Sequence, residues 1–243
     1  MRMLTFSKRC AKEILRDPLN LMFGLGFPIV LLLLLSAIQA NIPVALFELK
    51  SLTPGITVFG LSFMTLFSAT LVARDRESSF LQRLYTTPLK SADFILGYLL
   101  PIIPIAVIQS VICYLVAVIL GLPVTVHILS AILMILPVAV FYIALGLLCG
   151  SVFNVKQVGG ICGALLTNLS AWLSGIWFDL ELVGGTFKKI ADLLPFVHAV
   201  ELERAVLDGN FSEALPHLYP VLAYAVIITI GAVLFFLRQM KRQ

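Results

Sequence analysis

The sequence predicts an all-α integral membrane protein with six transmembrane helices. Of its 243 residues, 60% are apolar and only 12% are charged, about half the charged share of an ordinary soluble domain. A soluble protein of this size needs a charged surface that so few residues cannot supply. The composition therefore excludes a soluble globular protein, a disordered chain and a disulfide-stapled secreted module. It also argues against a nucleic-acid-binding protein, because the Lys and Arg residues cluster beside apolar runs.

Six apolar stretches are long enough to cross a bilayer, whose hydrocarbon core of about 30 Å requires roughly 20 apolar residues. None of them contains Asp, Glu, Lys or Arg, and they cover residues 19–40, 55–73, 94–120, 127–149, 158–178 and 218–237. The third stretch is longer than a perpendicular helix requires. Tilt, or kinks at Pro101 and Pro104, can absorb the excess length.

The distribution of basic residues predicts that both termini are cytoplasmic. Thirteen of the 17 Lys and Arg residues lie in the two terminal segments, in the loop after the second stretch and in the loop after the fourth. Basic residues concentrate on the cytoplasmic side of membrane proteins. A cleaved signal peptide is the alternative interpretation of the first stretch, which the long basic segment before it disfavours.

Residues 3–17 are predicted to form an amphipathic helix at the membrane interface. Met3, Phe6, Cys10 and Ile14 recur at helical spacing, while the other face is basic and polar. Such a helix lies with its apolar side in the acyl chains and its cations at the headgroups. It could act as an elbow that connects the first span to cytoplasmic movement, or as a passive anchor.

Residues 76–88 are predicted to form a second, shorter amphipathic helix. Phe80, Leu81, Leu84 and Tyr85 make an apolar stripe, and Thr87-Pro88 ends it. About ten residues cannot cross a bilayer. The stripe therefore lies on lipid at the cytoplasmic surface or fits a groove of a partner protein.

The segment before the last span is too apolar to be a free loop. Within residues 184–209, Pro195 separates two pieces that are each too short to cross the membrane. Two short outward-facing re-entrant helices packed against protein are the expected structure. They would form an outer gate or a packed cap.

Glycine spacing predicts close helix packing at two places. Gly146 and Gly150 end the fourth span, and Gly159 and Gly163 begin the fifth. Small residues at this spacing let two helix backbones approach. The packing is within the chain or against a second chain, and the first is the simpler expectation.

The chain lacks the motifs of several enzyme classes. No phosphate-binding G-x-x-x-x-G-K-[ST] loop and no H-E-x-x-H motif occur, so we expect no enzyme activity in this chain. The four Cys and three His residues do not cluster at metal-ligand spacing, which predicts no metal site and no cofactor. The spans also lack the ionisable residues that ion-coupled carriers use. We therefore expect energy for transport to come from outside the bilayer.

Three motifs resemble those of the ABC-2 type permeases, the transmembrane subunits of bacterial ATP-binding-cassette exporters, including drug- and antibiotic-efflux systems. They are Arg16-Asp17-Pro18 followed by Gly26-Phe27-Pro28, the loop from Arg74 to Pro88 followed by Gly97, and Leu194-Pro195-Phe196 with Arg204 and Gly209. The resemblance covers the whole chain. One departure is Ser78-Ser79, where the family often has Gly after the acidic residue of the loop.

The resemblance implies partners and a site of coupling. The permease would have no ATPase of its own, and a second copy or a similar permease would join it with two ATPase subunits that bind ATP and Mg²⁺. Residues 76–88 would be the coupling helix, seated in a groove of the ATPase. Glu77 and Arg83 would make polar contacts there, and Phe80, Leu81, Leu84 and Tyr85 would fill the groove. The complex would lie in the bacterial plasma membrane.

The cargo path would run between the two permease chains. Candidate lining residues are aromatic or polar side chains of three spans: Phe23, Phe27, Phe59, Phe63, Phe67, Asn168, Trp172 and Trp177. The alternative for each is a place in the core or against lipid. An uncharged interior suggests a lipophilic or amphiphilic cargo such as a drug, antibiotic, peptide or lipid-linked molecule. A polysaccharide or lipid-linked glycan exporter is the alternative, and an ion-coupled carrier or passive channel is the alternative from another class.

Overall fold

The computed structural model describes residues 2–43, 46–78, 80 and 91–240, and every regular element in this part of the chain is helical. Five of its helices are long and apolar enough to cross a membrane. They cover Pro18–Gln39, Leu49–Glu77, Asp93–Ile119, His127–Val152 and Phe211–Phe236. The protein is therefore an all-helical, multi-pass membrane protein.

The first third of the chain builds an N-terminal helix and two spans. Its elements are α1 (Arg2–Leu15), α2 (Pro18–Leu21), the π-helix η1 (Met22–Gly26), α3 (Phe27–Gln39) and α4 (Leu49–Glu77). The remaining elements are α6 (Ser91–Leu99), α7 (Ile102–Ile119), α8 (His127–Val152), α9 (Val155–Gly160), the π-helix η2 (Ile161–Leu166), α10 (Thr167–Trp172), α11 (Leu180–Val183), α12 (Gly185–Leu193), α13 (Pro195–Leu207) and α14 (Phe211–Met240).

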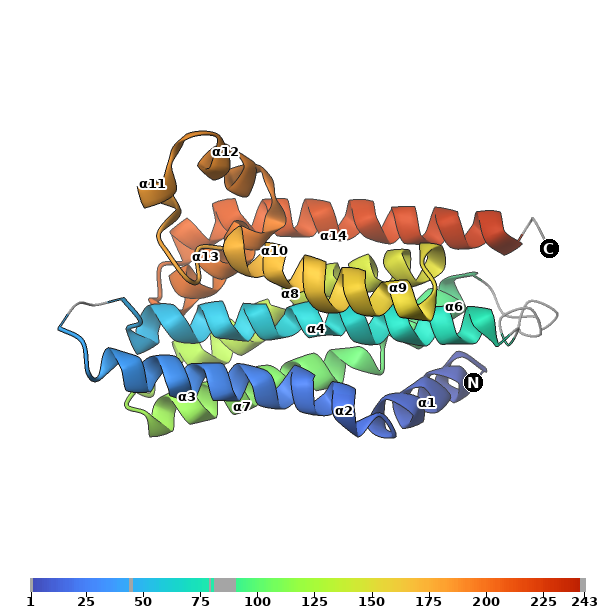
Figure 1. The fold of residues 1–243 in the computed structure, drawn as a ribbon, viewed down its shortest axis with the longest axis horizontal. Coiled ribbons are helices and arrows are strands. Elements are labelled where there is room, and N and C mark those ends of the chain that lie inside the picture. The colour runs from blue at the N-terminus through green and yellow to red at the C-terminus, as the bar shows by residue number, and fades with distance from the viewer. Residues whose placement is uncertain (1, 44–45, 79, 81–90, 241–243) are drawn as a thin grey trace.

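The long helices run along one axis, and both chain termini lie at the same end of the bundle (Figure 1). We call this the terminal end; it also carries α1, the C-terminal end of α4 and α9 (Figure 1). The other end, which carries α11, α12 and α13, we call the opposite end. This arrangement matches the prediction that the two termini share one side of the membrane.

Helix α4 is the centre of the bundle and packs most closely on α8. Thr65 Oγ1 donates a hydrogen bond to the carbonyl oxygen of Tyr142 at 2.9 Å, and Ser68 Oγ donates to that of Ile143 at 3.0 Å. A Cβ atom on Gly146 would collide with the Thr65 carbonyl oxygen and Ser68 Oγ, and one on Gly150 with the backbone of Ala69. The two glycines therefore let the backbones of α4 and α8 approach each other.

Two predicted spans are interrupted in the structure. The third divides into α6 and α7 on either side of Leu100 and Pro101, because a proline cannot continue the hydrogen-bonding of a helix. The fifth, predicted as residues 158–178, is helical only from Val155 to Trp172, and turns and bends follow. This segment is outside the group of five long apolar helices, since Lys156, Gln157 and Asn168 make it less apolar.

The segment 184–209 forms α12 and α13. Pro195 is the first residue of α13, a position where its missing N–H costs nothing. Helix α13 packs against α4, α8 and α14, and most of its side chains are buried. A helix too short to cross the membrane thus has its polar groups covered by protein.

Helix α1 is amphipathic, but its apolar face is covered by protein rather than directed wholly at lipid. Phe6, Cys10 and Ile14 are buried. The Phe6 ring packs edge-on against Tyr98 of α6, with centroids 4.9 Å apart. Leu15, in contrast, is 66% exposed. The expectation that the apolar face lies in the acyl chains is therefore wrong for Phe6, Cys10 and Ile14, because α6 offers a matching apolar surface.

Candidate functional site

The last four residues of α4, Arg74–Glu77, bond to residues of α1, α6, α8 and α9 and to the cap of α2. We call them the α4 stem. They directly precede residues 78–90, which hold most of the predicted coupling helix. A displacement of that loop would therefore reach the helix bundle through the stem.

Asp75 is the buried centre of the stem, with 2% of its surface exposed. Its two carboxylate oxygens accept hydrogen bonds from Nη1 and Nη2 of Arg9 in α1, at 2.6 and 2.5 Å. Oδ2 also accepts a hydrogen bond from the hydroxyl of Tyr98 in α6, at 2.7 Å. Two-pronged arginine–carboxylate pairs of this kind are short and geometrically specific. Asp75 therefore joins α4 to α1 and α6.

Arg9 extends the contact from Asp75 to two further groups. Its Nη2 bonds Glu13 Oε1 at 2.7 Å, and its guanidinium carbon lies 4.0 Å from the centre of the Phe80 ring, within the range of a cation–π contact. Burial lowers the pKa of Arg9, but the hydrogen bond and charge of Asp75 outweigh this effect, so the net pKa is raised. Arg9 thus stays charged and links α1 to the first part of the predicted coupling helix.

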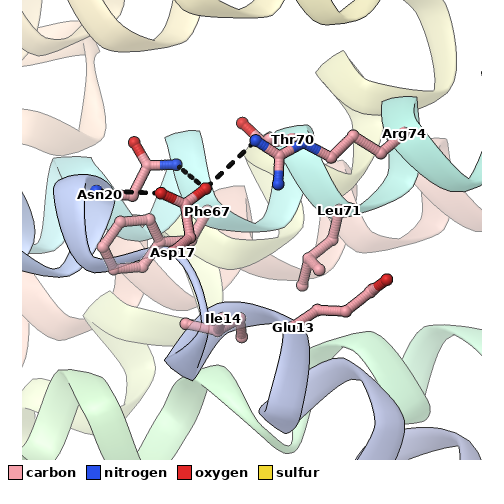
Figure 2. Close-up of a pocket in the computed structure, with 8 residues that line it drawn as sticks. All are labelled: Glu13, Ile14, Asp17, Asn20, Phe67, Thr70, Leu71 and Arg74. Atoms are coloured by element: carbon pink, nitrogen blue, oxygen red, sulfur yellow. Dashed lines mark hydrogen bonds and ion pairs between the residues drawn. The ribbon is translucent and has the colours of Figure 1, made fainter.

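Arg74 connects the stem to the start of the first span. Its Nη2 donates to Asp17 Oδ2 at 3.2 Å, and Asp17 also caps α2 by accepting from the backbone N–H of Asn20. Figure 2 shows Arg74 and Asn20 directed at the same Asp17 carboxylate. These residues border a small recess between α1, α2 and α4, lined by Glu13, Ile14, Asp17, Asn20, Phe67, Thr70, Leu71 and Arg74.

The remaining two stem residues bond the ends of α8 and α9. Arg76 donates to the carbonyl oxygen of Ser151 and, at 2.6 Å, to that of Phe153; a cation is favourable beside the carbonyl groups at the end of a helix such as α8. Glu77 Oε1 accepts from the backbone N–H of Val155 at 2.9 Å, at the start of α9. Through Arg76 and Glu77, the stem reaches the fourth and fifth spans.

The stem can transmit movement, because hydrogen bonds and ion pairs connect it to the neighbouring helices. Four consecutive residues contact α1, α2, α6, α8 and α9. A displacement of the stem would therefore have to move these elements with it or break charged hydrogen bonds. In the part of the chain that the structure describes, no group of three or more His, Cys, Asp or Glu residues is placed to hold a metal ion.

Of the six residues predicted to contact an ATPase, Glu77 and Phe80 are described by the structure, and both contact the chain itself. The other four, Leu81, Arg83, Leu84 and Tyr85, lie outside the described residues.

The predicted path residues divide into a clustered group, in which Phe59, Phe63 and Phe67 are buried and Phe27 is 38% exposed, and a second, exposed group. The rings of Phe27, Phe59, Phe63 and Trp177 form one aromatic cluster, with neighbouring centroids 5.9 to 6.1 Å apart. Phe67 is buried, and its ring occupies the space that a side chain at Gly24 would need.

The exposed group lies on the fifth span and the start of the first. Trp172 is 52% exposed and Phe23 43%. Asn168 is exposed and donates to the carbonyl oxygen of Ala164.

The two glycines predicted to pack closely in the fifth span differ in their surroundings. A Cβ on Gly163 would meet Leu66 at 3.4 Å, while one on Gly159 would meet nothing within 4 Å.

The role of Asp75 is not evident from the sequence, in which it is only one residue of the loop motif. The sequence of α1 does indicate that a buried acidic partner is needed. Arg9 and Glu13 are four residues apart on one helix face, and an arginine beside an apolar face that packs on protein requires an acidic partner. The sequence could not reveal which acidic residue that is, since 66 positions separate Arg9 from Asp75.

Comparison with known families agrees with this architecture. The sequence model of the ABC-2 type transporter family matches residues 1–207 of the chain, whereas no match was found among curated proteins. The matched region contains the stem, the predicted coupling loop and five of the six predicted spans. Membrane permeases of this family are not themselves catalytic, and ATP is hydrolysed by a partner. The chain thus belongs to the ABC-2 type transporter family, as its transmembrane permease subunit.

Proposed function

We propose that the chain is the permease of an exporter in which residues 76–88 form the coupling helix and dock on an ATPase subunit. The observation that carries the proposal is the α4 stem, in which Arg74, Asp75, Arg76 and Glu77 hold α1, α2, α6, α8 and α9. A force applied at residues 78–90 enters the bundle through these bonds. The chain has no phosphate-binding loop, so a separate ATPase would have to move the helix bundle through a connection of this kind.

The mechanism follows from differential binding. Closure of two ATPase subunits around ATP favours the permease conformation whose coupling helices fit the closed pair. The partly buried Arg9–Asp75 pair makes α1 and α4 move as one unit, because separating them leaves the buried charge of Asp75 without its partner. The spans then change the side of the membrane to which the path between two permease chains opens.

The proposed complex contains two permease chains, a second copy or a similar one, and two ATPase subunits. The terminal end would be cytoplasmic, as the basic residues predict, and the membrane would be the bacterial plasma membrane. Exposed Phe23, Asn168 and Trp172 are the candidates for a surface toward the path, because an amide on a span is costly against lipid. A lipophilic or amphiphilic cargo, such as a drug or antibiotic, suits this uncharged surface.

The test is the substitution Phe80→Asp, with Leu84→Asp as a second variant. We expect both to abolish ATP-driven transport and the stimulation of ATP hydrolysis by cargo, while the permease still accumulates in the membrane. Leu182→Asp is the matched control, because Leu182 is 84% exposed at the opposite end. Transport with a normal ATPase response in the Phe80 and Leu84 variants would disprove the coupling assignment. Uphill transport by the permease alone in an imposed ion gradient would favour a carrier.

A further inference from the structure

Helix α13 carries a carboxyl group, that of Glu203, which has no place in the coupling site. Glu203 lies at the opposite end of the bundle and has no exposed surface. Its neighbours on the same helix face, Ala199, Val206 and Leu207, are apolar and buried. Among the residues that the structure describes, Glu203 and Asp75 are the only buried acidic residues. Asp75 is satisfied by Arg9 and Tyr98, whereas Glu203 is not.

The hydrogen bonds of Glu203 are incomplete. The hydroxyl of Tyr114, a buried residue of α7, donates to Glu203 Oε2 at 3.3 Å. The second oxygen, Oε1, is buried and has no hydrogen-bond partner in the described part of the chain. An ionised carboxylate placed in this way would lose its hydration and gain one neutral hydrogen bond in return, which is strongly unfavourable.

The neighbouring basic residue does not compensate this charge. Arg204 follows Glu203 directly but points away from it. It donates to the carbonyl oxygens of Ser51 and Gly175, each at 3.2 Å, and to Glu201 at 2.7 Å. Arg204 therefore ties α13 to the start of α4 and to the turn after α10, and its charge is used there.

In the described part of the chain, no ion pair or hydrogen bond joins Glu203 to a titratable group around α13 other than Tyr114. On α14, His217 shares a hydrogen bond with His198 at 3.0 Å, and on α4, Lys50 pairs with Asp208 at 3.0 Å. His127 of α8 lies against Gly209, beyond the end of α13. From α12, the contact with α13 is the bond between the Asp192 carbonyl and His198.

From these contacts we infer that Glu203 is a proton-binding site, which holds a proton while α13 is packed in the bundle. The neutral acid needs no counter-charge, and its Oε2 can still accept the hydrogen bond of Tyr114. If α13 separates from α7, water reaches Oε1, the O–H bond of the acid breaks, and the proton passes to water at the opposite end. Packing of α13 and proton uptake are thus one event.

The direct test is the infrared absorption of the full-length permease in lipid nanodiscs near neutral pH. We expect a carbonyl band of a protonated carboxylic acid that is lost in Glu203→Gln. Glu201→Gln is the matched control, since Glu201 is on the same helix but half-exposed and paired with Arg204, and it should leave the band unchanged. Tyr114→Phe should shift the band, because the hydrogen bond to Oε2 is lost. A wild-type spectrum without the band, or a band that survives in Glu203→Gln, would overturn the assignment.

A second measurement covers the case in which Glu203→Gln alters folding. A carboxyl group that holds its proton in the folded state, but not in the unfolded state, makes stability fall as pH rises. We therefore expect the apparent unfolding temperature of the wild type to fall more steeply than that of Glu203→Gln between about pH 5 and pH 9. Glu201→Gln should follow the wild type. Equal slopes for wild type and Glu203→Gln would contradict a proton held by Glu203.

Discussion

Helices α4 and α14 have nearly the same length, 29 and 30 residues, yet they have opposite places in the bundle. In the most apolar part of α4, 94% of the residues are buried, against 17% in α14. Small and hydroxylated side chains line α4, and its Thr65 and Ser68 bond the backbone of α8. Large aliphatic side chains of α14, such as Ile227 and Leu234, are exposed.

The difference shows which helix can transmit a movement. A helix with partners on all sides cannot shift without moving them, since protein interiors are close-packed. A helix that faces lipid can tilt at little cost, because lipid replaces the contacts it loses. The α4 stem therefore lies at the end of the helix that is best connected to the rest of the bundle.

The largest effect is expected where α4 and α8 touch. Gly146→Leu should prevent the permease from accumulating in the membrane or destabilise it by at least about 3 kcal/mol, because its Cβ would collide with the Thr65 backbone. Gly231→Leu on α14 is the matched control, since a Cβ there meets nothing within 4 Å. Thermal unfolding in detergent measures both. Equal loss in the two variants would show that α4 and α14 are packed alike.

The next effect concerns the ion pair of the stem. Asp75→Ala leaves Arg9 and Tyr98 without their shared partner and should cost about 2–3 kcal/mol of stability, less than the roughly 3–5 kcal/mol of a fully buried pair because Arg9 is 31% exposed. Asp208→Ala should cost under about 1 kcal/mol, because its pair with Lys50 is solvent-exposed. Denaturation midpoints measure both losses of stability. Similar losses would contradict the claim that the stem ion pair stabilises the protein more than an exposed ion pair does.

A smaller effect reports on the docking of α1. Burial, with the charge of Asp75, raises the pKa of the Cys10 thiol to about 12, and its side chain is fully covered. With Cys113, Cys149 and Cys162 replaced by Ser, we expect very slow maleimide labelling near neutral pH. Asp75→Asn should accelerate labelling several-fold, because the thiol loses a charge that raises its pKa and because α1 separates from α6 more often. An unchanged rate would mean that α1 stays docked without the ion pair.

Much of the fold could be predicted from local sequence. Long apolar runs without charge give the spans, and the helical period of Phe6, Cys10 and Ile14 gives α1. The prediction failed where tertiary contacts decide. The helix of the fifth span ends at Trp172, and turns and bends follow where the continuous apolar run predicts helix to residue 178. The apolar face of α1 is covered by α6, and no local sequence pattern identifies α6 as its partner.

The candidate site was only partly predictable for the same reason. The loop motif predicts a functional role for residues 74–88. The role of Asp75, however, depends on its hydrogen bonds with Arg9 and Tyr98, which lie 66 and 23 positions away in the sequence. The aromatic ladder Phe59, Phe63 and Phe67 has regular spacing, yet the spacing does not show whether it faces a path. In the structure all three rings are buried.

A double-mutant cycle on the Arg9–Asp75 pair is the most direct test of coupling through the α4 stem. The variants are Arg9→Gln, Asp75→Asn and their combination: Asp75→Asn keeps side-chain size, Arg9→Gln shortens the side chain, and both remove charge. The measured quantity is cargo transported per ATP hydrolysed by the reconstituted complex, with co-purification of the ATPase as control. If the pair acts as one unit, each single variant loses coupling and the double variant is no worse than either. Independent losses that multiply in the double variant would contradict transmission through this pair.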